Sequence, residues 1–126
     1  MGGIEPNFDR LGGLIPVVVQ DYTSGEILML AFMNRQAWGE TLRTRLATYW
    51  SRSRNELWVK GEQSGNLQEV KEIYVDCNED TVLLKVTQQG GGACHTGHRS
   101  CFYRRLEGGE LKEIDERVFD PEEVYR

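Results

Sequence analysis

Apolar residues in this chain form short runs that alternate with stretches of glycine, asparagine and charged residues. The run at 14–20 (LIPVVVQ) is rich in β-branched residues, and the run at 27–33 (ILMLAFM) follows it after the polar stretch 21–26. Short runs of this kind, bounded by turn residues, are typical of β-strands. The pattern therefore predicts two strands joined as a hairpin near the start of the chain.

The segment 35–45 has a helical pattern instead. Asn34 precedes it and can cap the first turn, because an asparagine side chain accepts hydrogen bonds from the free N–H groups there. At helical spacing, one less polar face is formed by Ala37, Trp38, Thr41 and Leu42. Gly39 weakens the helical preference, but the pattern still predicts the main helix of the protein here.

The remaining runs predict further strands, at 48–51, 57–60, 67–75, 81–87, 102–106 and 111–114. Turns are expected near Asn55 and at Gly108-Gly109. Residues 1–13 contain several glycines and a proline and predict a loosely structured lead-in, and the acidic tail after Pro121 predicts a short helix. Together these elements predict a single domain over residues 1–126. Its expected class is α+β, mostly β, with a mixed or antiparallel sheet folded on itself and one main helix.

The composition narrows the class of partner. The 126 residues are 39% hydrophobic and 28% charged, which is typical of a soluble globular protein. The net charge of −5 argues against a nucleic-acid backbone as partner, but it leaves room for a small phosphorylated ligand held by a local basic cluster. No apolar run is long enough to cross a bilayer and no secretory signal is visible, so we expect a cytoplasmic protein with no membrane partner.

Residues 90–102, which we call the cysteine loop, hold both histidines and two of the three cysteines of the chain. An odd number of cysteines disfavours a disulfide framework and favours thiolate chemistry or a metal site. Cys94 and Cys101 are seven positions apart and Cys77 lies upstream, so the paired spacing common in zinc sites is missing. The alternative is that Cys77 is a small buried apolar residue and that the other two cysteines have no joint role.

Three thiolates on one zinc ion would leave the fourth position for water, as in catalytic zinc sites. His95, next to Cys94, is the candidate base for that water. If His95 or His98 were a fourth ligand, the site would be closed, and the protein would be a non-catalytic module whose zinc staples a dimer. A set of Cys94, His98 and Cys101 on one helical face is disfavoured by the glycines of the loop. We therefore expect His98 to be exposed or to face an anion.

Two further clusters have possible chemistry. Asp76, Asn78 and Asp80 alternate around Cys77 and would suit an oxygen-bound cation such as magnesium, although a solvated acidic turn is an equal alternative. A second cluster combines basic, hydroxyl and aromatic side chains, which suit a phosphate and a flat heterocycle. Its members are Trp50, Ser51, Arg52, Ser53, Arg54, Trp58 and Lys60. The alternative for this cluster is a hairpin with outward charges and buried tryptophans.

Several motifs occur in a specific order: Tyr49-Trp50-Ser51-Arg52-Ser53-Arg54, Leu57-Trp58-Val59-Lys60-Gly61-Glu62, Ser64-Gly65-Asn66, Val75-Asp76-Cys77, Ala93-Cys94-His95-Thr96-Gly97 and Ser100-Cys101-Phe102. In these motifs the chain resembles the phosphoribosyl-AMP cyclohydrolases, over most of its length from Gly13 to about Arg104. The resemblance implies an enzyme of histidine biosynthesis that opens the adenine ring of phosphoribosyl-AMP by hydrolysis between N1 and C6. Zinc-activated water would attack C6 and His95 would move the proton.

The resemblance also implies an intertwined homodimer with a zinc ion shared between subunits, held by Cys77 of one chain and by Cys94 and Cys101 of the other. The substrate-binding residues expected from the matching motifs are Trp50, Ser51, Arg52, Arg54, Lys60 and Ser64. The magnesium ligands of the family are three aspartates, of which Asp76 and Asp80 match while Asn78 departs from the pattern. An amide oxygen can still coordinate, with one negative charge less. The pyrophosphohydrolase domain that follows in some relatives is not expected here.

Overall fold

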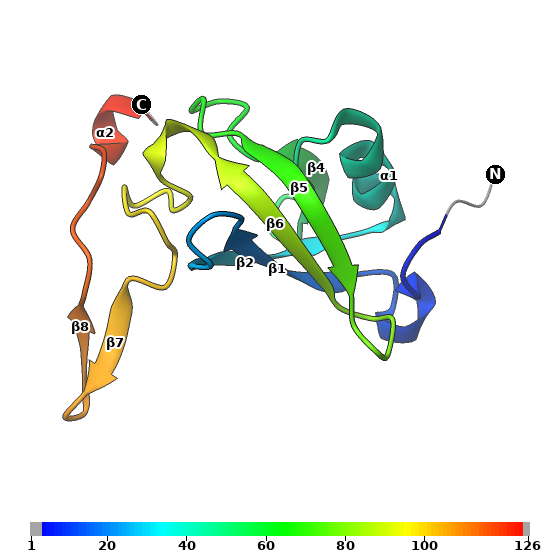
Figure 1. Cartoon of the computed structure of the whole chain (residues 1–126), viewed down its shortest axis with the longest axis horizontal. Helices are drawn as coiled ribbons and strands as arrows, with labels where there is room; N and C mark the ends of the chain where they lie inside the picture. The colour runs from blue at the N-terminus through cyan, green and yellow to red at the C-terminus, as the bar shows by residue number, and fades with distance from the viewer. Residues whose placement is uncertain (1–3, 125–126) are drawn as a thin grey trace.

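The computed structural model describes residues 4–124 and is built around a four-stranded mixed sheet (Figure 1). In spatial order its strands are β2 (Ile27–Met33), β1 (Ile15–Asp21), β6 (Val82–Gln88) and β5 (Gln68–Val75). The β1–β2 and β5–β6 pairs are antiparallel, as the hairpin pattern predicts, whereas β1 and β6 run parallel. The expected α+β class with a mixed sheet is therefore confirmed.

Alternation along the central strands places one face of the sheet in the core. Successive side chains of a strand point to opposite faces, and in β1 the buried positions include Ile15, Val17 and Val19. In β6 the buried positions include Val82 and Leu84, and Val17 lies opposite Val82 in the parallel register. The apolar faces of β1 and β6 thus form one continuous layer.

The predicted helix is α1 (Arg35–Thr44). Asn34 caps it, since its Oδ1 accepts a hydrogen bond from the N–H of Ala37 at 2.8 Å. Of the residues on its less polar face, Ala37, Trp38 and Thr41 are buried, whereas Leu42 is 38% exposed. Each helical residue is rotated by about 100° from the previous one, and this rotation carries Leu42 from the buried face to its rim.

A separate hairpin packs beside the helix and forms one wall of the site described below. It consists of β3 (Thr48–Ser51) and β4 (Glu56–Val59), joined by a turn in which Asn55 has a φ of 56°. Buried Tyr49 donates a 2.6 Å hydrogen bond to Gln68 Oε1, and Gln68 Nε2 donates to Gln88 Oε1 at 2.8 Å. This buried polar network fixes the hairpin to β5 and β6, because buried polar groups are costly when they lack partners.

The C-terminal part of the chain forms a hairpin that stands away from the main sheet (Figure 1). Its strands, β7 (Arg104–Glu107) and β8 (Glu110–Glu113), and the short helix α2 (Pro121–Val124) correspond to the predicted elements. Leu106 and Leu111 on this hairpin are 70% and 59% exposed. Within residues 4–124 we find no helix that is both long and apolar enough to cross a membrane.

The lead-in is more ordered than its composition predicts. A 3-10 helix, η1 (Phe8–Leu11), places Phe8 in the core, where it is 1% exposed. The N–H of Asn7 donates a 2.6 Å hydrogen bond to the carbonyl of Glu79, in the β5–β6 turn. The prediction of a loose segment over 1–13 is therefore wrong for this helix, because a single aromatic side chain supplies the apolar contact. Residues 1–3 lie outside the described residues.

Candidate active site

The cysteine loop follows β6 and folds back on itself. After the short 3-10 helix η2 (Gln89–Gly91), the N–H of Ala93 donates to the carbonyl of Arg99 at 2.8 Å, and the N–H of Cys94 donates to that of His98 at 3.1 Å. The N–H of Cys101 donates to the Leu28 carbonyl of β2 at 2.7 Å. These hydrogen bonds bring the two ends of the loop together, so that Cys94 and Cys101 become neighbours.

Side chains also attach the loop to the first hairpin. Arg99 forms ion pairs with Asp21 at 2.9 Å and with Glu26 at 2.8 Å. Ser100 Oγ donates a 2.6 Å hydrogen bond to the carbonyl of Ile27. The loop is therefore held on the rigid sheet, as the precise placement of functional side chains requires.

The Cys94 and Cys101 thiols lie side by side and next to a buried ammonium group. Cys94 is 4% exposed. Desolvation of the Cys101 thiol, together with the adjacent Cys94 sulfur, raises the pKa of Cys101. Lys60 is 7% exposed, and its Nζ donates to the carbonyl of Ala93. Burial lowers the pKa of Lys60, while the Cys101 and Cys94 sulfurs oppose that shift. The two sulfurs and one cation thus form a single electrostatic cluster.

A cavity of about 940 Å³ opens beside this cluster. Its walls come from the β3–β4 hairpin, the following turn, the cysteine loop and the start of α2. Six residues that the sequence predicted for the site line it: Ser51, Arg54, Lys60, Ser64, His95 and Cys101. Because His95 is exposed and borders the cavity beside Cys101, it can reach a bound molecule there.

Two predicted substrate-binding residues, Trp50 and Arg52, are not among those that line the cavity. The Arg52 guanidinium instead lies over the ring of Phe32, 3.9 Å from its centroid. Sequence reasoning did not assign the wall formed by Pro121 and Glu122 of α2. No local signal marks that wall, since it depends on a contact between the C-terminal tail and a hairpin far away in sequence. Trp58, which the sequence places in the same cluster, does line the cavity.

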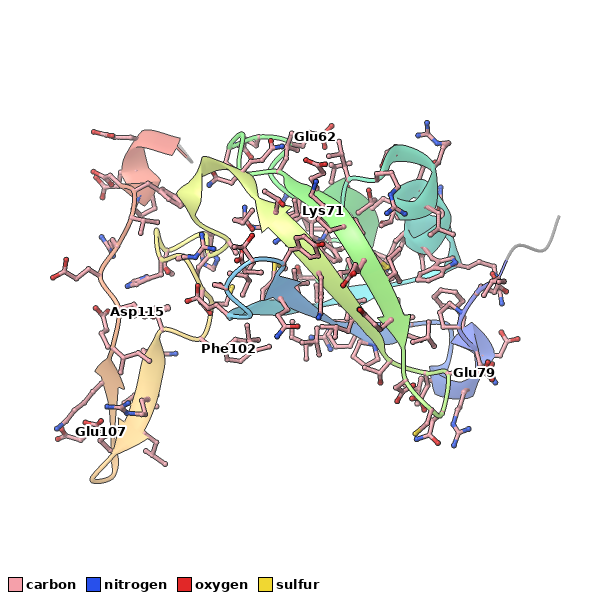
Figure 2. The ribbon with its side chains drawn as sticks, viewed as in Figure 1. Glu62, Lys71, Glu79, Phe102, Glu107 and Asp115 are labelled. Atoms are coloured by element: carbon pink, nitrogen blue, oxygen red, sulfur yellow. The ribbon has the colours of Figure 1, made fainter. Side chains whose placement is uncertain are left out.

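Cys77 lies far from the other two cysteines of the same chain. It is exposed in the turn before β6, whereas Cys94 and Cys101 follow that strand. A strand of this length spans roughly 23 Å, but zinc holds each sulfur at only about 2.3 Å. Figure 2 labels Glu79, in the turn of Cys77, and Phe102, next to Cys101, well apart along the molecule. Across residues 4–124, no three His, Cys, Asp or Glu side chains cluster closely enough to hold a metal ion.

The acidic turn around Cys77 has a defined hydrogen-bond pattern. Asp76 Oδ1 accepts hydrogen bonds from the N–H groups of Asp80 at 3.0 Å and Thr81 at 3.2 Å. Asp80 also forms an ion pair with Arg10 at 3.3 Å, and Asn78 is exposed. One Asp76 oxygen thus stabilises the turn and the Asp80 carboxylate pairs with Arg10 of η1, while magnesium binding stays a prediction.

His98 is buried, which corrects the expectation of an exposed or anion-facing side chain. It is 1% exposed, and its ring stacks on that of Tyr103 with 3.6 Å between the centroids and an interplanar angle of 4°. Its Nδ1 lies 2.8 Å from the hydroxyl of Thr96. The hydroxyl belongs to the cysteine loop and the stacking ring to the residue that follows it, and the periodicity of the segment does not predict this packing.

Gly97 is the position where a larger residue is expected to disrupt this loop. Its φ is 98°, and an added Cβ would overlap the carbonyl oxygen of Phe119. We expect Gly97→Ala to lower the free energy of unfolding by more than the about 1–3 kcal/mol that positive-φ strain alone costs. Gly13→Ala is the matched control, because Gly13 has a φ of 99° and no heavy atom within 4 Å of the added Cβ. Urea unfolding of both variants checks this, and equal losses would contradict it.

Comparison with known proteins places the chain in a family. The sequence model described as phosphoribosyl-AMP cyclohydrolase matches residues 29–103. The phosphoribosyl-AMP cyclohydrolase of Desulfatibacillum aliphaticivorans is 62% identical over 98% of this chain and 98% of its own. Those of Desulfotalea psychrophila and Desulforapulum autotrophicum are 58% and 55% identical, with at least 97% of each chain covered. The chain therefore belongs to the phosphoribosyl-AMP cyclohydrolase family, whose members are hydrolases acting on carbon–nitrogen bonds.

Proposed function

We propose that this protein opens the adenine ring of phosphoribosyl-AMP by hydrolysis of the N1–C6 bond, as a step of histidine biosynthesis. The observation that carries the proposal is the cavity, which joins His95 and Cys101 on one side to Ser51 and Arg54 on the other. A thiol pair and a base beside hydroxyl and guanidinium groups suit hydrolysis of a phosphorylated heterocycle. A cytoplasmic location remains a prediction from the sequence.

A zinc ion fits the thiol pair only in part within one chain. Adjacent Cys94 and Cys101 offer two soft ligands, and the exposed Cys77 is too far away to be a third. We therefore infer a homodimer in which Cys77 of a second copy completes the set. The exposed leucines of the β7–β8 hairpin support such an assembly, since they offer apolar surface for another chain. When bound, zinc would supply the Lewis acidity that activates water for attack on C6.

The residues of this chain then have distinct tasks. His95 would take up and return the proton of the attacking water, because it borders the cavity and is accessible. Arg54, Ser51 and Ser64 would bind the phosphate and ribose, and Trp58 would provide an apolar wall for the flat base. Lys60 has its ammonium on the Ala93 carbonyl beside the thiols, which favours a role at the thiol pair over direct phosphate binding.

Magnesium would bind at the acidic turn. Asp76, Asn78 and Asp80 flank Cys77 in sequence, so a second copy that supplies Cys77 also brings these oxygen ligands to the cavity. Asn78 contributes an amide oxygen in place of a carboxylate, and the site has one negative charge less as a result. A magnesium ion there would lie next to the substrate phosphates.

Removal of the metal tests the proposal. We expect the purified protein to convert phosphoribosyl-AMP with a change in ultraviolet absorbance, to lose this activity after treatment with a zinc chelator, and to regain it on addition of zinc. Magnesium addition without zinc serves as the control and should not restore the activity. Turnover by fully metal-free protein would contradict the zinc mechanism. A dimer that separates on chelation but never reacts with the substrate would instead support the zinc-stapled module.

A further inference from the structure

Three side chains of the cysteine loop form a continuous chain of hydrogen bonds. Cys94 Sγ lies 2.9 Å from the Thr96 hydroxyl, and that hydroxyl lies 2.8 Å from His98 Nδ1. The backbone fixes their spacing, since the N–H of Gly97 donates to the Cys94 carbonyl at 3.1 Å and Gly97 has a φ of 98°. Cys94, Thr96 and His98 are thus held on one tight turn.

The proton positions in this chain follow from the charge of the sulfur. A cysteine that holds a metal ion is a thiolate and can only accept a hydrogen bond. Thr96 has a single hydroxyl proton, so it must donate that proton to Cys94 and accept a hydrogen bond in return. The donor is the Nδ1–H of His98, the only other partner of the hydroxyl within the described chain.

Burial holds His98 in place for this task. The ring lies against Tyr103, and Nε2 has no hydrogen-bond partner among the described residues. The Glu113 carboxylate of β8 is 3.9 Å from Nε2. An unpaired polar nitrogen in a buried ring is costly, and the contact with Thr96 is the hydrogen bond that His98 makes through Nδ1.

We propose that Thr96 and His98 are positioning residues that orient Cys94 as a metal ligand, with His98 donating to Thr96 and Thr96 donating to the Cys94 sulfur. The inference rests on the proposed function in that Cys94 is taken as a zinc ligand. Groups that hydrogen-bond to metal ligands fix their orientation, and their removal typically weakens metal binding by about 10–100-fold. His98 acts only through Thr96, and Thr96 acts only through Cys94.

Zinc affinity of the full-length dimer, measured by competition with a chromophoric chelator, tests the proposal. We expect Thr96→Val, which keeps the shape and removes the hydroxyl, to weaken zinc binding by about 10–100-fold. Thr96→Ser retains the hydroxyl and should bind zinc as the wild type does, a rescue that a packing role would not produce. His98→Phe keeps an aromatic ring against Tyr103 without the donor and should also weaken zinc binding. His98→Asn retains an N–H donor and should bind zinc as the wild type does.

A double variant shows whether the two residues form one chain. If His98 acts only through Thr96, zinc affinity of the Thr96→Val/His98→Phe protein equals that of Thr96→Val alone. A further loss in the double variant, or wild-type zinc affinity in Thr96→Val, overturns this proposal. Wild-type protein that binds zinc but does not react with phosphoribosyl-AMP overturns only the proposed function. Wild-type protein that binds no zinc overturns both.

Discussion

Cys77→Ser and Cys94→Ser variants are each expected to lose zinc and ring-opening activity, and a mixture of the two is expected to recover part of both. The reason is the separation of Cys77 from the thiol pair within one chain. If a zinc site takes Cys77 from one subunit and the other two sulfurs from its partner, then a mixed dimer has one site with all three cysteines. A dimer of either variant alone contains no site with all three cysteines.

The size of the recovery can be stated in advance. When the two variants are co-expressed or refolded together and pair at random, about half of the dimers are mixed and each has one intact site, so activity per chain should reach about a quarter of the wild-type value. Metal analysis on the same samples should show the same fraction of zinc. The oligomeric state is measured alongside.

A mixture of Cys94→Ser and Cys101→Ser is the matched control. Both sulfurs belong to the same loop, so every possible dimer of these variants lacks one of them in each site. We expect no recovery from this pair. Recovery here, or full activity in Cys77→Ser alone, would show that the zinc site is not divided between subunits as proposed.

His95→Ala is expected to lower kcat by about 10²–10⁴-fold, the range for loss of a general acid–base group. The zinc content should stay close to that of the wild type, because the proposed ligands are all cysteines. His95 lines the cavity beside Cys101 and is exposed, which suits proton transfer to a bound substrate. Steady-state kinetics and metal analysis of one preparation measure both quantities.

Added imidazole provides a control for this variant, since a small base can occupy the space left by the removed ring. Partial recovery of kcat with imidazole supports a proton-transfer role. Loss of zinc from His95→Ala would instead make His95 a ligand. The zinc site would then be closed, and the stapled module would be the better description of the protein.

Local sequence patterns were sufficient for most of the secondary structure. Asn34 marks the start of α1 because a capping side chain acts within one turn, and the strands of the first hairpin follow from β-branched runs next to turn residues. The β3–β4 hairpin is found for the same reason, with Asn55 at its turn. These are interactions between residues that are close in sequence.

Features that depend on distant contacts were missed. Phe8 is in the core although glycines surround its segment, and His98 is buried with its ring stacked on Tyr103. Pro121, from the tail of the chain, lines the cavity. None of these follows from the periodicity of its own segment, since each position is decided by a partner elsewhere.

In the candidate site, too, residues that are close in sequence were predictable and contacts between distant segments were not. Cys94, His95 and Cys101 share one loop, and their grouping beside the cavity agrees with the sequence reasoning. The distance between that loop and Cys77 does not follow from the positions of the cysteines in the sequence, because it depends on the length and direction of β6. The sequence predicts Lys60 as a substrate-binding residue, and the contact of its ammonium with the Ala93 carbonyl depends on the tertiary structure.

The parallel pairing of β1 with β6 has a consequence for how the chain folds during synthesis. β1 lies between β2 and β6, and Val17 pairs with Val82. Until residues 82–88 leave the ribosome, the hairpin of β1 and β2 has an open edge and an uncovered apolar face, which is the arrangement that promotes association with other chains. Contacts between segments this distant also form slowly. We therefore expect the first third of the polypeptide to be the segment that most needs a chaperone during synthesis.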